Sequence, residues 1–536
     1  MKLQSKYVPV IYLLLGLWAY KNTFSVFIPG DDYSLFYLFK TEGLAGAIHN
    51  LGLYLFSLPF IFVLYKLIGD SSFAWVAASL LLHVINSYLV FVLAKKILSC
   101  VVQERNDLIA FFSGAAFLLS PYQTEAVLWT PTDVTILLSV LLSLLCILLL
   151  LNYFEDQRSA QLYGSWLFFV AAVFSYESSW IVPGLALLLF IFVRYNGKKP
   201  LTVKEFLLKI SIPQGLILVS YFVLSKFLYG NWLWHAQHFG ISSSFAQLAG
   251  CTMKYFARFF LFYRYLPLNA MDEFLREAYS HKSILLITGI LLFMLSIVAL
   301  AGIISRKNAK LRLLTFVFLC FLVSLLPVLS LDSSFLRNIY PDRYGYFPSV
   351  FFYVFAASCI TLVLKKFSLP VLIGYVALCW ILLAQTISVW TSASEYCNRL
   401  TESYRPFLKY DKVYVLNVPA YYKGVAAFRS AFAETIFMKY DCAADNIRVV
   451  SGCYQRSPAD SVVSVSRTDS SVLVVGPRMK TPYFSSSGGW AVSYETDEYA
   501  VKYDLAGCAY TLRFKGEIPR NSAFVYCSGG IWKKAL

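Results

Sequence analysis

Charged residues are scarce in this chain. Of its 536 residues only 14% are Asp, Glu, Lys or Arg, whereas 58% are hydrophobic. A soluble domain is nearer half apolar and a quarter charged, so the composition excludes an ordinary soluble protein. Long, nearly uncharged runs recur between residues 7 and 390. They predict a membrane protein with many spanning helices.

Other features are missing as well. The first apolar run, 7–28, has no small-residue cleavage site, which predicts a retained span and not a cleaved signal peptide. The sequence shows no internal repeat and no low-complexity tract. The net charge is +16, but the basic residues form short clusters between apolar runs. This pattern indicates membrane topology and not nucleic-acid binding.

Apolar runs long enough to cross a bilayer give the candidate spans. They are 7–28, 51–67, 73–94, 108–120, 132–153, 161–175, 179–194, 205–229, 283–304, 311–330, 348–364 and 369–390. The run 51–67 is short and is broken by Pro59. The basic clusters all fall on the side of the N-terminus only if this run does not cross. We therefore expect about eleven spans, with 51–67 as a re-entrant or interfacial helix.

The same rule places the loops. With the N-terminus in the cytoplasm, the first external loop 29–72 and the long external loop 230–282 face outward. We expect a transmembrane module over 1–390 and an external soluble domain over 391–536. The expected location is a bacterial inner membrane, with the site and the C-terminal domain facing the periplasm or exterior.

The region 391–536 is polar and rich in Ser and Tyr. Period-two stretches such as "KVYVLNV", "SVLVVG" and "AVSYETDEYAVKYDL" predict strands, and "GVAAFRSAFAETIFMKY" predicts a helix. Together these patterns predict that the region forms a small α/β or mostly-β domain. Its cysteines are Cys397, Cys442, Cys453, Cys508 and Cys527. In an oxidising compartment Cys442 could pair with Cys453 and Cys508 with Cys527, or all could be buried free thiols.

In so apolar a chain, the polar residues at the external ends of the spans stand out. They are Asp31, Asp32, Gln123, Glu125, Asp133, Glu177, His235, His238, Arg337, Asp342, Arg343 and Tyr344. Acids near a bilayer usually serve a site or an ion path. A carboxylate can act as general base, and an arginine can hold a phosphate bidentately. An external site has no easy access to cytoplasmic nucleotide sugars, so we expect a lipid-phosphate-linked sugar as donor.

The order of these blocks resembles the GT-C membrane glycosyltransferases. The most similar pattern is the protein O-mannosyltransferase-like group, which includes transmembrane enzymes with tetratricopeptide repeats. The similar blocks are the acid pair Asp31–Asp32, "SPYQTEAV" at 120–127, "SYES" at 175–178 and "DRYGYFPS" at 342–349. The resemblance covers roughly residues 1 to 390. Ser120 and Gln123 stand where the family often has histidines, Tyr176 stands where it has lysine, and no tetratricopeptide repeats follow.

The resemblance implies an all-α polytopic fold and a hexosyl- or mannosyltransferase-like activity. A sugar would move from a polyprenyl-phosphate carrier to a hydroxyl acceptor on a protein or envelope glycan, with inversion. Asp31 and Asp32 would be the base and its helper, and Arg343, Arg337 and Tyr344 would hold the donor phosphate. Glu125, Glu177, His235, His238 and Gln123 would support the site. No metal is required; if one binds, Mg²⁺ or Mn²⁺ would be held by Asp31 or Asp32.

Several of these residues could have a purely structural role. Asp31 and Asp32 could cap the helix that starts near Tyr33. Glu125 and Glu177 could bond to backbone at helix ends, and Arg343 could pair with Asp342. A transporter or flippase of a lipid-linked or small polar substrate is the alternative function. Transporters, however, place charges near the midplane on repeated, broken helices. A non-catalytic assembly factor with a degenerate site is a third hypothesis.

Overall fold

The computed structural model describes most of the chain. The described residues are 5–27, 30–101, 106–196, 201–233, 245–265, 281–304, 308–329, 342–429, 431–455, 463–469, 471–477, 484–485, 493–504, 509–518 and 520–535. The chain divides into two compact units. The helical unit comprises Met1–Lys21, Ile48–Leu67 and Ala74–Thr386, and the C-terminal unit comprises Asn22–Ala47, Ile68–Phe73 and Ile387–Leu536. Each is described by itself.

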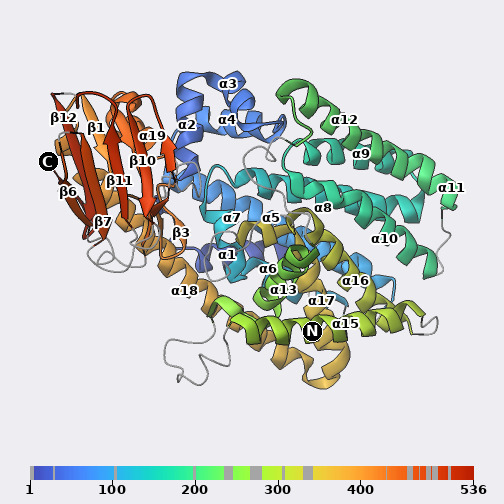
Figure 1. Ribbon diagram of the computed structural model, residues 1–536. Coiled ribbons are helices and arrows are strands. Elements are labelled where there is room, and N and C mark those ends of the chain that lie inside the picture. Colours follow the sequence, from blue (N-terminus) through green and yellow to red (C-terminus); the bar gives the residue numbers. More distant parts are fainter. Residues whose placement is uncertain are drawn as a thin grey trace. The chain divides into compact units, whose positions relative to one another are not determined.

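The helical unit holds most of the helices labelled in Figure 1. They are α1 (Val8–Ala19), α4 (Ser57–Ile68), α5 (Ser72–Ser99), α6 (Asn106–Leu118), α7 (Thr124–Leu128), α8 (Val134–Asp156), α9 (Ser159–Val173), α10 (Val182–Tyr195), α11 (Val203–Phe206), α12 (Ile212–Tyr229), α13 (Phe245–Leu261), α15 (His281–Ile304), α16 (Ala309–Leu325) and α17 (Tyr346–Leu364). Short turns η2 (Pro121–Gln123), η3 (Glu177–Ile181), η6 (Tyr263–Tyr265) and η8 (Asp342–Gly345) connect them. Helices α3 (Gly43–Leu51) and α18 (Ser368–Ser403) belong partly to each unit.

Six helical segments in the described ranges are long and apolar enough to cross a membrane. They are Ser72–Ser99, Val134–Asp156, Glu177–Tyr195, Val203–Tyr229, Ala309–Val328 and Asp342–Phe407. The last of these contains the two predicted spans 348–364 and 369–390. Shorter apolar helices lie at 5–19, 106–118, 159–173 and 286–298, where spans were also predicted. The prediction of an integral membrane protein with a polytopic helical fold is confirmed.

Two predicted segments differ from the structure. The first helix ends at Ala19 and not at residue 28, because Lys21 and Asn22 interrupt the apolar run. The region 230–282, predicted as a loop, contains helix α13. The arginine and lysine in that helix made it look like a loop, but its apolar face is buried at Cys251, Tyr255 and Phe259.

The run 51–67 contains most of α4. The 12 residues of this helix span only about 18 Å, which is too short to cross the bilayer alone.

Two residues of the helical unit, Gly114 and Tyr346, lie at close contacts between its helices. Figure 1 shows α8 between α9 and α10, which both contact it. A Cβ on Gly114 of α6 would lie 2.7 Å from the Ser87 carbonyl oxygen of α5 and would clash with the Tyr12 hydroxyl of α1. The buried Tyr346 hydroxyl, at the start of α17, meets His83 Nδ1 at 2.8 Å. These contacts hold α1, α5, α6 and α17 together.

Among the described residues, the strands of the C-terminal unit form three sheets. The orders are β13-β12-β1-β4, β6-β7-β11-β10-β9 and β3-β2-β5-β8. The strands are β1 (Lys412–Val415), β2 (Val418–Tyr422), β3 (Val425–Ala426), β4 (Ile447–Val449), β5 (Gly452–Gln455), β6 (Val463–Arg467), β7 (Val472–Pro477), β8 (Phe484–Ser485), β9 (Ser493–Glu495), β10 (Tyr499–Asp504), β11 (Ala509–Phe514), β12 (Ser522–Ser528) and β13 (Ile531–Lys534). Its short helices are α2 (Asp31–Thr41) and α19 (Phe432–Tyr440).

The strand pattern explains the core of this unit. Along β10, Tyr499, Val501 and Tyr503 are buried, whereas Lys502 and Asp504 are exposed. This alternation places one face against the core, as a period-two pattern predicts. Strand β1 runs parallel to both β12 and β4, whereas β6, β7, β11, β10 and β9 pair antiparallel. The predicted small domain with strands and a helix is confirmed.

The predicted helix over 424–440 is only half right. Val425 and Ala426 form β3, and the helix begins at Phe432. Gly424 and Arg429 have φ angles of 86° and 36°, which a right-handed helix does not accept.

Of the two alternatives for Cys442 and Cys453, a disulfide or free thiols, the structure shows free thiols. Both residues are free cysteines; Cys442 is half-buried, and Cys453 is buried beside the Gln455 side chain, 3.4 Å from its Nε2. Cys397 is also a free, buried thiol on α18. Cys508 lies outside the described residues. For Cys442 and Cys453 the alternative of free thiols holds.

Candidate active site

The segment 120–133 is held against α17 by polar side chains. Ser120 Oγ accepts the backbone N–H of Tyr122 at 3.2 Å and caps η2, with Pro121 in its first position. Ser120 Oγ also accepts the Tyr353 hydroxyl at 2.5 Å. Gln123 Nε2 donates to Ser349 Oγ at 2.7 Å. Ser120 and Gln123 therefore bind this segment to α17, the helix that follows "DRYG".

Arg343 joins the two segments. Its backbone N–H donates to Glu125 Oε2 at 2.8 Å. Its guanidinium Nη1 lies 3.6 Å from Glu125 Oε1 and 3.8 Å from Asp133 Oδ1, with all three side chains at least nine-tenths buried. The guanidinium also lies 4.3 Å from the centre of the Trp129 ring, and its Nη2 donates to the Tyr344 hydroxyl at 3.2 Å. The arginine is thus oriented from several sides.

Asp342 is paired with two other arginines. Arg258 Nη1 lies 3.0 Å from Asp342 Oδ1, and Arg264 Nη1 bonds to Oδ2. Arg264 Nη2 also donates to the Pro121 carbonyl at 3.2 Å. Asp342 therefore pairs with these two arginines, and the sequence alternative in which Arg343 satisfies Asp342 is not what the structure shows. Asp342 is itself buried.

The sequence analysis missed Arg258 and Arg264. Both lie within the region that was predicted to be a loop, and neither was among the predicted site residues. The sequence did hold a signal for them. Both stand in the apolar stretch "ARFFLFYRYL", where a charged side chain needs a partner.

The cluster is balanced in charge only while every acid is ionised. It contains Arg258, Arg264 and Arg343 against Glu125, Asp133 and Asp342. Burial raises the pKa of the Glu125 carboxyl to about 7, against the attraction of Arg343. Near neutral pH a large share of molecules therefore carry a protonated Glu125 and a net positive cluster. Such a cluster favours an anion.

Glu177 belongs to a second polar group of the helical unit. Both of its carboxylate oxygens accept the Tyr54 hydroxyl, at 3.0 and 3.3 Å. The Tyr54 ring lies parallel to that of Tyr176, with centroids 6.2 Å apart. The Tyr176 hydroxyl interacts electrostatically with Tyr344 and Arg343. Tyr176 thus packs beside Tyr54, the residue that binds Glu177, and is close enough to Arg343 for electrostatic interaction.

Asp31 and Asp32 begin helix α2 of the C-terminal unit. The N-cap is Gly30, and no side chain makes a capping bond, so the alternative that either acid is the N-cap is wrong. Both lie in the first turn, where the helix dipole favours carboxylates. Asp32 is 1% exposed. Asp31 Oδ2 accepts Arg429 Nη1 at 2.6 Å, and its side chain is 29% exposed. The sequence analysis gave Arg429 no role.

The predicted site residues thus fall in three groups. Gln123, Glu125, Glu177, Arg343 and Tyr344 belong to the helical unit, and Asp31 and Asp32 belong to the C-terminal unit. His235, His238 and Arg337 lie outside the described residues. Within the described ranges, no group of three or more His, Cys, Asp or Glu side chains is arranged to hold a metal ion.

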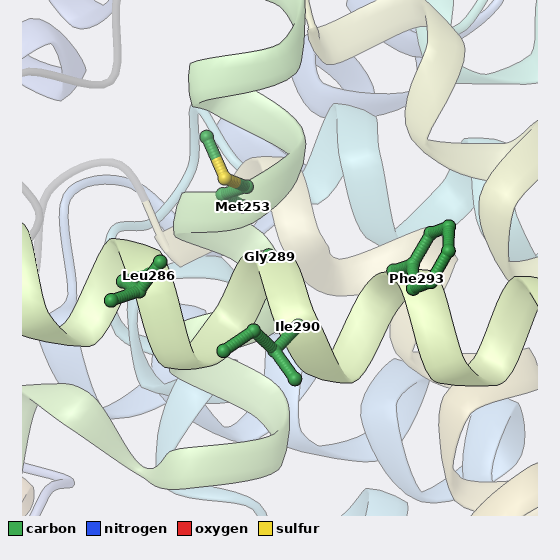
Figure 2. Close-up of a pocket in the computed structure, with 5 residues that line it drawn as sticks. All are labelled: Met253, Leu286, Gly289, Ile290 and Phe293. Atoms are coloured by element: carbon green, nitrogen blue, oxygen red, sulfur yellow. The ribbon is translucent and has the colours of Figure 1, made fainter.

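An apolar groove of about 420 Å³ lies between α13 and α15. Figure 2 shows Met253 approaching from α13 and Leu286, Gly289, Ile290 and Phe293 along α15. Met253 precedes Arg258 on the same helix. The groove therefore presents hydrocarbon surface on the helix that also carries one arginine of the cluster.

No protein-family model matches this sequence, and no curated protein matches it. Two solved structures are among those that match this chain. One is an oligosaccharyltransferase of Archaeoglobus fulgidus in complex with Zn and sulfate; it is 13% identical, with a TM-score of 0.40, over 85% of this chain and 68% of that one. The other is ArnT from Cupriavidus metallidurans bound to undecaprenyl phosphate; it is 13% identical, with a TM-score of 0.34, over 76% and 82% of the two chains. At this distance the similarity assigns no residue and no reaction.

Proposed function

We propose that this chain is an integral membrane glycosyltransferase. It moves a sugar from a polyprenyl-phosphate carrier to a hydroxyl group on a protein or envelope glycan at the external face of the membrane. Asp31 or Asp32 acts as the base, and the other acid positions a substrate. The kind of sugar, of hexosyl or mannosyl type, follows from the sequence resemblance alone.

The main support for this proposal is the contact between two sequence blocks in the helical unit. Glu125 and Arg343 are 218 residues apart in the chain, yet a backbone hydrogen bond and an ion pair join them. Glu125 belongs to the block "SPYQTEAV" and Arg343 to the block "DRYGYFPS". Both blocks resemble the glycosyltransferase pattern.

The arginines of this cluster suit the donor phosphate. A guanidinium group matches a phosphate bidentately and stabilises charge on a departing oxygen. We assign the carrier phosphate to Arg343, with the Tyr344 hydroxyl beside it and Arg337 as a further ligand. Protonation of Glu125 offsets the arriving negative charge. The groove of α13 and α15 offers the apolar surface that a polyprenyl chain needs.

In the proposed reaction, a carboxylate takes the proton of the acceptor hydroxyl while the hydroxyl oxygen attacks the anomeric carbon. The bond from that carbon to the phosphate oxygen breaks, and polyprenyl phosphate leaves with the bonding electrons. A single displacement inverts the anomeric centre.

The test is sugar transfer from a synthetic polyprenyl-phosphate sugar by the purified full chain. We expect Asp31→Asn and Asp32→Asn to lower kcat by roughly 10² to 10⁴, which is the usual contribution of a general base. Full activity in both variants would exclude the catalytic assignment.

Asp70→Asn is the matched control, because Asp70 is an exposed acid of the same predicted loop. It should retain activity. A transporter or flippase would move the lipid-linked substrate without forming product, and an assembly factor would form none either. We expect transfer to persist in EDTA; loss that Mg²⁺ or Mn²⁺ restores would instead assign a metal to Asp31 or Asp32.

A further inference from the structure

The C-terminal unit places an arginine directly on the first acid of α2. Arg429 Nη1 donates to Asp31 Oδ2 at 2.6 Å, although the two residues are 398 positions apart. The side chains are 21% and 29% exposed. This ion pair joins the loop that carries the proposed base to the domain for which the sequence suggested no function.

The pair is one end of a longer contact between α2 and α19. The rings of Tyr37 and Phe437 meet edge to face with centroids 5.0 Å apart. At the far end, Lys40 Nζ lies 3.0 Å from Asp441 Oδ1. Residue numbers rise together along both helices, so α2 and α19 run in the same direction, side by side (Figure 1).

Arg429 is held in an unfavourable backbone conformation. Its φ of 36° lies in the left-handed region, which a residue with a Cβ rarely adopts. Such a conformation persists where the surrounding structure fixes it, and functional sites are a common place for it. The residue in this conformation is the one whose guanidinium pairs with Asp31. It also separates β3 from α19.

The charges around Asp31 are mixed. Besides Arg429, the nearby Glu434 of α19 is half-buried. Burial and the negative charge of Asp31 raise the pKa of the Glu434 carboxyl. The two acids lie close enough for their charges to repel, and Arg429 supplies a positive charge that offsets this repulsion. Arg429 therefore does more than join two helices.

We propose that Arg429 is a positioning residue for the Asp31 carboxylate, so that the C-terminal domain completes the acidic pair of the first external loop. The inference deepens the proposed function and rests on it. A base must be held within hydrogen-bond reach of the proton that it takes, and a misplacement of about 1 Å can cost 10²-fold in rate. The contact with Arg429 fixes the direction of this carboxylate.

The Lys40–Asp441 pair provides a control for simple docking. It joins the same two helices, but its side chains are 42% and 84% exposed and it does not contact Asp31. Lys40→Met therefore removes a charge from the same contact without disturbing the acid.

The experiment compares Arg429→Met, Arg429→Lys and Lys40→Met in transfer by the full chain. For Arg429→Met we expect kcat to fall by roughly 10- to 100-fold, with the KM for the donor changed by less than about twofold. Arg429→Lys should restore part of the loss, and Lys40→Met should leave kcat nearly unchanged. Equal losses in Arg429→Met and Lys40→Met would overturn the proposal in favour of docking. A rise in donor KM alone would overturn it in favour of direct donor binding.

A measurement independent of transfer separates this inference from the proposed function. The ion pair predicts that Asp31→Asn and Arg429→Met shift the melting temperature non-additively when combined. Additive shifts would contradict the contact. An inactive wild-type chain with non-additive shifts would refute the glycosyltransferase but leave the pairing of Asp31 with Arg429 intact.

Discussion

Glu125 accepts the backbone N–H of Arg343 and lies beside its guanidinium, yet burial raises the pKa of its carboxyl to about 7 from 4.5. A carboxyl with a raised pKa binds its proton more tightly in the folded state. The stability that this group contributes is complete below about pH 4.5 and is lost as the pH rises towards 7.

We therefore expect the stability of the wild-type chain to fall between pH 5 and 7.5, by on the order of 1 to 3 kcal/mol for this group. Glu125→Gln should remove that part of the slope. Thermal unfolding of the purified protein at several pH values measures both. Identical slopes in the two proteins would show that Glu125 does not titrate in this range.

Glu495→Gln is the control for removing a carboxyl group. Glu495 is exposed, and hydrogen bonding to Lys515 lowers the pKa of its carboxyl. It stays ionised throughout the range, so its removal should leave the slope as in the wild type.

At this scale the sequence predicted the polar residues better than their partners. Asp31, Glu125 and Arg343 stood out because a charge in an apolar chain is costly. The arginines that pair with the aspartates did not: Arg429 contacts Asp31 from 398 residues away, and Arg258, which pairs with Asp342, lies on a helix that was predicted as a loop. Spacing along a chain cannot show contacts of that kind.

Among the helices, α6 depends on one residue without a side chain. A Cβ on Gly114 would meet the Ser87 carbonyl oxygen at 2.7 Å and clash with the Tyr12 hydroxyl. Backbone cannot move aside as a flexible side chain can. We expect Gly114→Ala to destabilise the protein by about 1 to 3 kcal/mol through overpacking, measured as a lower melting temperature.

Gly215→Ala on α12 tests the same substitution where there is space. Among the described residues, no atom beyond the adjoining residues and backbone of its own helix lies within 4 Å of a Cβ at that position. The change should be neutral or slightly stabilising, since alanine favours helix by up to about 1 kcal/mol over glycine. A similar loss in both variants would mean that close approach at Gly114 is not the cause.

Long apolar runs and alternating strands were predictable, because each is a repeated local pattern. The span 132–153 became α8, and "AVSYETDEYAVKYDL" became the β9–β10 pair. Elements that depend on single residues were not predictable. Residues 424–440 looked helical, but the φ angles of Gly424 and Arg429 produce a strand and then a shorter helix.

For the whole molecule, charge placement predicts that the C-terminal region lies outside and the loop between α15 and α16 inside. Asp469 is exposed in a bend after β6, and Lys310 is exposed at the start of α16. In intact cells, Asp469→Cys should react with a membrane-impermeant maleimide, whereas Lys310→Cys should react only after permeabilisation.

The unmodified chain gives the background of its own cysteines. Labelling of Lys310→Cys in intact cells, with Asp469→Cys protected, would reverse the proposed orientation. It would also place Asp31 and Asp32 in the cytoplasm, where a lipid-linked donor is no longer the expected substrate.

The C-terminal unit is assembled from three separated stretches of chain, and this affects the order of events during synthesis. Asp31 leaves the ribosome long before Arg429, which follows 398 residues later. At 5 to 20 residues per second, that interval is roughly 20 to 80 s. During it, α2 has neither its arginine nor its partner helix. A nascent chain, or one truncated before Arg429, therefore lacks the partner of Asp31, and this contact forms only when the C-terminal unit has folded.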